Sequence, residues 1–379
     1  MTEETRSVDA LMTEVKRAAE AQHVSPRLAA WLAEVRERNG SDLYLVAGAP
    51  PALRVHGRVE RLDEPLLESD EIEHLVHAVL PPHARASYVE RGHGDASMRY
   101  GAFGRFRINL HRERGRAAAS IRALPVEPPQ LDSLNLPPGV EALSRLRSGL
   151  VLIGGPTGSG KTTTVAALVD LINRRDARHI VTIEDPIEYD HVHHRSIVEQ
   201  VEIGIDAPDF PTALRSAVRQ SPDVIVVGEM RDPETMRMAL AAGETGHLVF
   251  STLHTTDVAA TIARVADGFP TERQSTVRQE LSMALAAVMT QMLVPTAEGS
   301  RVPAVELLMV GYGARQQIRK NALQHLNQEI TFTRKDGSFT LEECLALLVR
   351  RGVLSIEDAR ARAAHREEFD GLMSGWGGR

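Results

Sequence analysis

Residues 150–168 read LVLIGGPTGSGKTTTVAAL, and this segment is the strongest indicator of the fold class. The apolar run 150–153 predicts a buried strand, and residues 162–173 predict a helix. Between them, residues 155–162 match the pattern G-x-x-x-x-G-K-[ST] at every fixed position. Strand, loop and helix together predict a phosphate-binding loop in an α/β domain, rather than a glycine-rich turn without a ligand.

This loop supplies the groups that a nucleotide phosphate requires. Its glycines let the backbone wrap around a phosphate so that successive N–H groups point inward, and the start of the helix adds partial positive charge. Lys161 is expected to reach the β- and γ-phosphate oxygens, and the Thr162 hydroxyl is expected to hold Mg²⁺. We expect ATP rather than GTP, because the chain contains no Asn-Lys-x-Asp motif. The predicted nucleotide-binding residues are Gly155, Pro156, Thr157, Gly158, Ser159, Gly160, Lys161, Thr162 and Thr163.

Composition limits the class of protein. A length of 379 residues predicts two or three domains, and 42% hydrophobic with 25% charged residues is typical of globular proteins. No apolar stretch is long enough to span a membrane, and the N-terminus has no signal-peptide core, so we expect a cytoplasmic protein. The single cysteine, Cys344, excludes an intrachain disulfide and a multi-cysteine zinc site. A net charge of −7 disfavours a nucleic-acid partner.

The pattern of elements divides the chain into four segments. Residues 1–38 are expected to form a helical extension, and residues 39–124 a small α+β domain. Residues 125–140 are rich in proline and predict a linker. From residue 141 to residue 379, alternating strands and helices predict a parallel sheet with a mainly helical C-terminal part, in which residues 272–293 are expected to form one long helix.

Acidic residues follow two of the predicted strands, at the sheet edge where open α/β folds bind ligands. Glu229 follows a short apolar strand and is the expected catalytic base for water, although a surface glutamate after a strand is the simpler alternative. Gly228 stands before it, where an acid for Mg²⁺ is common. Glu184 and Asp185 are therefore expected to supply Mg²⁺ ligands, with Glu184 also counted among the catalytic residues, unless both only form a turn.

Histidine and arginine side chains are further candidates for the site. His254 lies at a strand end and is expected to contact the γ-phosphate, although an isolated histidine is often structural. His247 is about 23 Å away along an extended strand at ~3.3 Å per residue, so we expect it at a subunit or domain contact. Arg105, Arg107 and Arg112 come from the N-terminal domain and are candidates for an arginine finger across an interface, or else belong to a solvated strand face.

Four segments resemble the motifs of the type II/type IV secretion ATPases. The resemblance lies in their Walker A (155–163), their aspartate box (183–189), their Walker B (227–232) and their histidine box (245–255). In that family a glycine precedes the Walker B glutamate, which accounts for Gly228.

The resemblance implies a homo-hexameric ring whose subunits combine a PAS-like N-terminal domain with a RecA-like ATPase domain, with sites between subunits. It implies a cytoplasmic motor, peripheral at the inner membrane, that docks on the inner-membrane pilus platform protein and moves pilins through ATP-driven domain rotation. Residues 41–43, 48–51 and 106–109 resemble the N-terminal domain of the pilus-retraction branch. Because the assembly branch usually carries a four-cysteine zinc motif, the single cysteine also favours retraction, and with it twitching motility.

Three departures from the family pattern leave alternatives open. Residues 200–204 read QVEIG and lack an arginine, and Thr256 stands where asparagine is usual. The retraction motif is degraded at residues 317–324, which leaves room for an accessory paralogue of the retraction ATPase. A RecA-like nucleic-acid translocase is the alternative of a different class. A regulatory subunit that binds ATP with little turnover is a third, and Glu229 argues against it.

Overall fold

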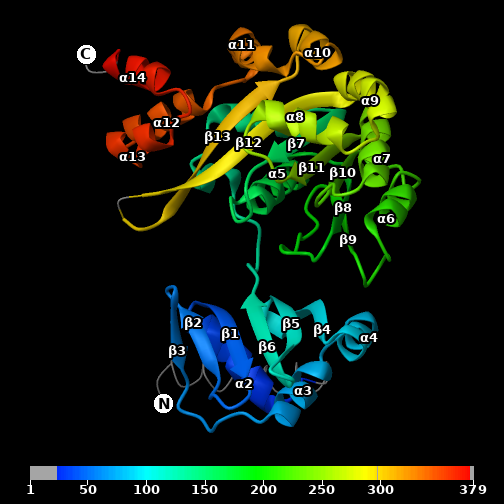
Figure 1. The fold of residues 1–379 in the computed structure, drawn as a ribbon, viewed down its shortest axis with the longest axis vertical. Helices are drawn as coiled ribbons and strands as arrows, with labels where there is room; N and C mark the ends of the chain where they lie inside the picture. The colour runs from blue at the N-terminus through cyan, green and yellow to red at the C-terminus, as the bar shows by residue number, and fades with distance from the viewer. Residues whose placement is uncertain (1–23, 297, 376–379) are drawn as a thin grey trace. The chain divides into compact units, whose positions relative to one another are not determined.

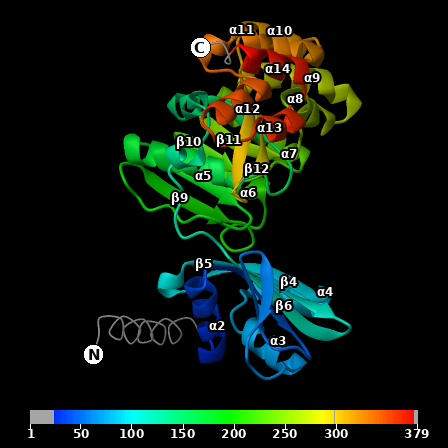
Figure 2. The same cartoon turned by 90° about the vertical axis from the view of Figure 1, so that its left-hand side faces the viewer.

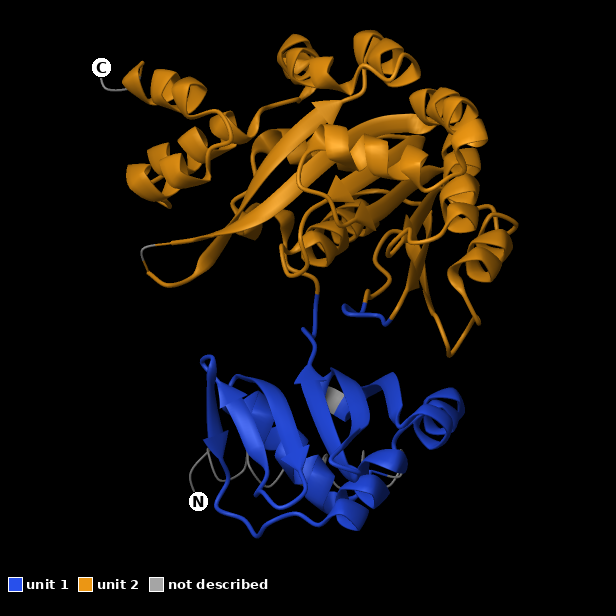
Figure 3. Cartoon of the chain, in the orientation of Figure 1, with its two compact units in different colours: residues 1–127, 186–190 blue, residues 128–185, 191–379 orange. Residues whose placement is uncertain are grey.

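The computed structural model describes residues 24–296 and 298–375, so most of the predicted N-terminal extension lies outside the described residues. The chain forms two compact units (Figure 3). The N-terminal unit comprises Met1–Glu127 with Pro186–Asp190, and the C-terminal unit comprises Pro128–Asp185 with His191–Arg379. Each unit is described by itself.

The N-terminal unit contains a six-stranded antiparallel sheet of order β3-β2-β1-β6-β5-β4 (Figure 1). Helix α2 packs into its core through Leu28, Trp31, Leu32 and Val35, the residues whose helical spacing is visible in the sequence. The elements are α2 (Pro26–Glu37), β1 (Gly40–Val46), β2 (Ala52–Val55), β3 (Arg58–Arg61), α3 (Ser69–His77), α4 (Pro82–Arg91), β4 (His93–Arg99), η1 (Gly101–Phe103), β5 (Arg105–Glu113) and β6 (Arg116–Ala123).

The C-terminal unit contains a seven-stranded sheet of order β13-β12-β7-β11-β10-β8-β9. Every neighbouring pair is parallel except β12 with β13. Its elements are η2 (Leu131–Leu134), η3 (Pro138–Arg145), β7 (Gly149–Gly154), α5 (Lys161–Arg175), β8 (His179–Glu184), β9 (Ile197–Glu202), α6 (Phe210–Ala217), β10 (Val224–Val227), α7 (Pro233–Glu244), β11 (Leu248–Leu253), α8 (Val258–Asp267), α9 (Thr271–Ala284), β12 (Leu285–Pro295), β13 (Arg301–Met309), α10 (Tyr312–Arg319), η4 (Leu323–His325), α11 (Leu326–Phe332), η5 (Arg334–Asp336), α12 (Leu341–Arg350), α13 (Ile356–Arg362) and α14 (Arg366–Ser374).

Helices cover the two faces of this sheet (Figures 1 and 2). A cluster of buried apolar residues lies on each face. Along β7 the side chains alternate between them, because successive residues of a strand point to opposite faces. Val151 and Ile153 pack with α5 and α12, whereas Leu150 and Leu152 pack with α6, α7, α8 and α9. The α/β fold with a parallel sheet, predicted from the sequence, is confirmed.

Some predicted elements differ from those in the structure. The predicted helix 272–293 is wrong in its second half, because α9 ends at Ala284 and the chain continues as β12 between β7 and β13. Strands β2 and β3 form a hairpin that turns at His56 and Gly57, both with positive φ. Part of the proline-rich segment packs into the core, since Leu131, Leu136 and Val140 are buried there. Among the described residues, no helix is both long and apolar enough to cross a bilayer.

Candidate functional site

The parallel register brings four strand ends to one edge of the sheet. Gly154 at the end of β7 pairs with Leu253 of β11, and Val227 of β10 pairs with both Ser251 of β11 and Ile183 of β8. The phosphate-binding loop, His254 and Glu229 follow three of these strands, and Glu184 is the last residue of β8. Residues distant in sequence therefore meet at the carboxyl edge, where open α/β sheets bind ligands.

Glycine is required at several positions of the loop 155–160. Gly158 and Gly160 have φ of 77° and 86°, a conformation that other residues rarely adopt. At Gly155 the limit is space, because an added Cβ would lie 2.4 Å from the carbonyl oxygen of Gln291 and 2.5 Å from Ser159 Oγ. The loop can keep this shape only with these glycines.

Lys161, the first residue of α5, is buried at the base of the loop. Its Nζ donates hydrogen bonds to the carbonyl oxygens of Gly155, at 2.8 Å, and Pro156, at 3.0 Å. Burial lowers the pKa of the Lys161 ammonium group, and the negative charge of Glu229 opposes this shift. The ammonium group is thus held at the loop and electrostatically coupled to the predicted base.

The loop also fits a phosphate group. Among the described residues, Ser159 Oγ is a buried polar atom without a hydrogen-bond partner, and Ser159 is 3% exposed. Such a group is unfavourable unless a ligand or water satisfies it. It lies directly before the N-terminus of α5, where backbone N–H groups and the helix dipole favour an anion.

Glu229 lies in the loop after β10, and its side chain is 16% exposed. It forms an ion pair with Arg231, and its Oε2 lies 3.4 Å from His254 Nε2. The other ring nitrogen of His254, Nδ1, lies 3.5 Å from Thr157 Oγ1 in the loop. A continuous line of polar contacts therefore joins the loop to Glu229 through His254.

Glu184 is the last residue of β8 and lies at the same edge of the sheet. The register places it opposite Gly228, where an added Cβ would lie 3.6 Å from Glu184 Cα. Its Oε1 accepts hydrogen bonds from Thr182 Oγ1 at 2.7 Å and from Gln200 Nε2 at 3.2 Å. Asp185 is exposed and Thr162 is half-buried. The carboxylate oxygens of Glu184 and Asp185 and the hydroxyl oxygen of Thr162 are ligands of the kind that Mg²⁺ prefers.

The three predicted arginines belong to β5 of the N-terminal unit. Arg105 lies 3.7 Å from the carboxylate of Asp190 in the same unit, and Arg112 lies over the ring of Tyr88. Arg107 is exposed. The role of an arginine finger across a subunit interface stays a prediction for all three arginines. His247, expected at a contact, places Nδ1 3.1 Å from the carbonyl oxygen of Ala242.

Comparison with known proteins gives the family. Residues 112–361 match the family model described as "Type II/IV secretion system protein". The chain belongs to this family.

Members of the family with named roles cover nearly the whole chain. The type IV pilus retraction ATPase PilT of Pseudomonas aeruginosa is 41% identical over 338 residues, which are 89% of this chain and 98% of that protein. The type IV pilus ATPase PilU of the same species is 36% identical over 328 residues, 86% of each chain. A crystal structure of the pilus retraction motor PilT with bound ADP has a TM-score of 0.81 at 42% identity, covering 90% of this chain and 98% of that one.

These comparisons confirm the family predicted from the four motifs, and the activity that goes with it: this family member is an ATPase. Sequence reasoning missed the role of Arg231, the ion-pair partner of Glu229. The position of Arg231, two residues after the predicted base, is the feature of the sequence that could have indicated this role.

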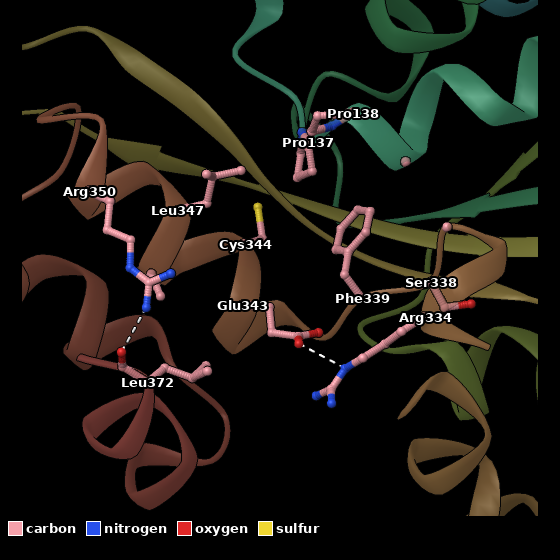
Figure 4. Close-up of a pocket in the computed structure, with 13 residues that line it drawn as sticks. Pro137, Pro138, Arg334, Ser338, Phe339, Glu343, Cys344, Leu347, Arg350 and Leu372 are labelled. Atoms are coloured by element: carbon pink, nitrogen blue, oxygen red, sulfur yellow. Dashed lines mark hydrogen bonds and ion pairs between the residues drawn. The ribbon is translucent and has the colours of Figure 1, made fainter. Parts of the chain in front are cut away.

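A separate pocket of about 440 Å³ lies among η3, α12 and α14 of the same unit (Figure 4). Its cationic groups are engaged by the protein: Arg334 Nε lies 2.8 Å from Glu343 Oε1, and Arg350 Nη2 donates to the carbonyl oxygen of Leu372 at 2.8 Å. Burial raises the pKa of the Cys344 thiol to about 12, so it is not a thiolate at neutral pH. None of the predicted nucleotide-binding residues lines this pocket.

Proposed function

We propose that this family member is an ATP-hydrolysing motor that powers the retraction of type IV pili. The observation that carries the proposal is the line of contacts from Thr157 through His254 to Glu229 beside the phosphate-binding loop. The match to 98% of the length of a pilus retraction ATPase supports the role in pili.

In this proposal the loop and Lys161 bind the phosphates of ATP, and Ser159 Oγ gains the partner that it lacks. Thr162, with Glu184 and Asp185, would hold Mg²⁺, which supplies positive charge against the phosphate oxygens. Glu229 orients the attacking water and takes its proton as the bond to the γ-phosphorus forms and ADP leaves. Its contacts with Arg231 and His254 hold the carboxylate in place.

The proposal includes an assembly. We expect a homo-hexamer with one of Arg105, Arg107 and Arg112 reaching a neighbouring subunit's nucleotide. The motor would work at the cytoplasmic side of the inner membrane, docked on the pilus platform protein and acting on pilins indirectly. No nucleic-acid partner is expected, since the net charge is −7.

A second candidate is an accessory pilus ATPase similar to PilU. Its support is the 36% identity to PilU over 86% of the chain, together with the degraded retraction motif at residues 317–324. Both candidates share the ATPase site, so only an experiment in cells separates them.

The ATPase is tested with purified full-length protein. We expect Mg²⁺-dependent ATP hydrolysis, and loss of nucleotide binding in Lys161→Ala, because this removes the ammonium group at the loop. Addition of double-stranded DNA should leave the rate unchanged. Strong stimulation by DNA would instead favour a nucleic-acid translocase.

The role in pili is tested by counting pili on cells that lack the gene, by electron microscopy, with twitching measured in parallel. Many pili without twitching would support retraction. Bald cells would mean that the motor extends pili, and unchanged piliation would favour the accessory role. Complementation with Lys161→Ala controls for the need for nucleotide binding.

A further inference from the structure

Gln291 is a buried polar residue that the predicted mechanism does not use. It lies on β12, directly after Thr290, which pairs with Gly154 at the end of β7. Gln291 is 4% exposed. The register thus places a glutamine side chain beside the start of the phosphate-binding loop.

Both ends of the Gln291 amide are engaged by the nucleotide site. Its Nε2 donates to the carbonyl oxygen of Ser159 in the loop at 2.7 Å, and its Oε1 accepts from Thr164 Oγ1 in the first turn of α5 at 2.8 Å. One partner needs a donor and the other needs an acceptor. An amide provides both, whereas a methionine of similar length provides no donor and only a weak acceptor.

The loop packs closely around this residue. A Cβ at Gly160 would lie 2.9 Å from Gln291 Nε2, and one at Gly155 would lie 2.4 Å from the Gln291 carbonyl oxygen. Glycines at these two positions therefore allow the loop to approach β12, in addition to approaching a phosphate.

The bond to Ser159 also sets the orientation of the next N–H group. The Ser159 carbonyl and the Gly160 N–H belong to one planar trans peptide, in which they point in opposite directions. Because Gln291 holds the carbonyl toward β12, the Gly160 N–H faces away from β12. A phosphate-binding loop requires backbone N–H groups that can point at the phosphate.

We propose that Gln291 is a positioning residue for nucleotide binding, which fixes the peptide between Ser159 and Gly160 and ties the loop to α5 through Thr164. This inference rests on the proposed function, since it assumes that the loop binds nucleotide. In this proposal, strand β12 supports the nucleotide site through Gln291, and Gln291 itself does not touch the nucleotide.

The test compares full-length wild-type protein with Gln291→Met and with Thr164→Val. ADP affinity in the presence of Mg²⁺ is measured by calorimetry, and kcat and KM for ATP by steady-state hydrolysis. We expect Gln291→Met to weaken ADP binding and raise KM by about tenfold, because two buried hydrogen bonds are lost. Thr164→Val, which removes one bond and keeps the shape, should have a smaller effect in the same direction.

A double variant separates positioning from simple packing. With Gln291→Met in place, Thr164→Val should change ADP affinity little further, because the shared bond is already gone. Gln274→Met is the matched control, since Gln274 lies on α9 and its Nε2 donates to the carbonyl oxygen of Phe269. It should leave affinity unchanged.

The outcomes are distinct. If wild-type protein binds neither ADP nor ATP, the proposed function itself is wrong. If wild-type binds but Gln291→Met binds ADP within twofold of it and only melts at lower temperature, Gln291 is a core residue and the inference is overturned. If Gln291→Met does not fold, unchanged ADP affinity in Thr164→Val overturns it.

Discussion

Glu229 is held by two neighbours that arrive from different parts of the chain. Arg231 follows it in the same loop, whereas His254 comes from the end of the next strand in the sheet. A carboxylate fixed on two sides loses less freedom when it orients a water molecule, which is the requirement for a general base.

Removing this carboxylate should stop hydrolysis without preventing binding. We expect Glu229→Gln to lower kcat by roughly 100-fold or more, because the amide keeps the shape but cannot accept the proton of water. ADP affinity should stay close to that of wild-type protein.

The measurement is steady-state hydrolysis with calorimetry of ADP binding. The matched control is Glu234→Gln, a few residues further on, whose carboxylate forms an ion pair with Arg215 on the surface. A Glu229→Gln protein with unchanged kcat would rule out Glu229 as the base.

At the scale of elements, helix α7 supports the loop that carries Glu229 and Arg231. Asp232 is its N-cap and accepts a hydrogen bond from Thr235 N at 2.8 Å. The cap fixes where the loop ends and the helix begins, because its side chain satisfies a backbone N–H that the first turn leaves free.

Replacing this cap should affect both stability and activity. We expect Asp232→Ala to lower the free energy of unfolding by about 1 kcal/mol. It should also lower kcat several-fold, because the preceding residues lose their anchor.

Ser355→Ala is the comparison for Asp232→Ala. It removes the N-cap of α13, where Ser355 accepts a bond from Asp358 N at 3.0 Å. Chemical unfolding measures the stability of both variants, and steady-state hydrolysis measures their kcat. Together they show whether the α7 cap positions Glu229. Equal losses of stability with equal, unchanged kcat would show that the α7 cap does not position Glu229.

At the scale of the whole molecule, Glu306 makes stability depend on pH. It lies on β13, and burial raises its pKa to about 7, helped by the negative charges of Glu342 and Asp257. The Val258 backbone N–H and His365 oppose this shift. Since the unfolded carboxyl has the lower pKa, the folded protein retains its proton to higher pH.

The stability contributed by protonated Glu306 is therefore present at low pH and lost as the pH rises from about 4.5 to about 7. We expect Glu306→Gln to be more stable than wild-type protein at pH 8, by an amount on the order of 3 kcal/mol, and the difference to shrink toward pH 5. Urea unfolding of both proteins at several pH values, with EDTA present, measures this difference in the free energy of unfolding. Parallel pH profiles for the two proteins would contradict the assignment.

Features that depend only on neighbouring residues can be predicted from the sequence. The strand, loop and helix around Lys161 follow from a short pattern, since strand, glycine turn and helix start each need only local residue types. The same holds for Glu229, two residues after an apolar strand, and for His254, directly after another. Parallel order in the sheet then brings them together.

The conformation and the role of β12, in contrast, depend on contacts between distant parts of the chain. Residues 285–293 continue from a helix, and residues such as alanine, leucine and methionine suit a helix as well as a buried strand. The local pattern therefore extended the predicted helix over them. Pairing with β7, more than 130 residues earlier, makes the segment a strand. Propensity is a weak preference that such pairing overrides. Gln291 meets the phosphate-binding loop for the same reason, because sheet register, and not nearness in sequence, sets which residues lie side by side.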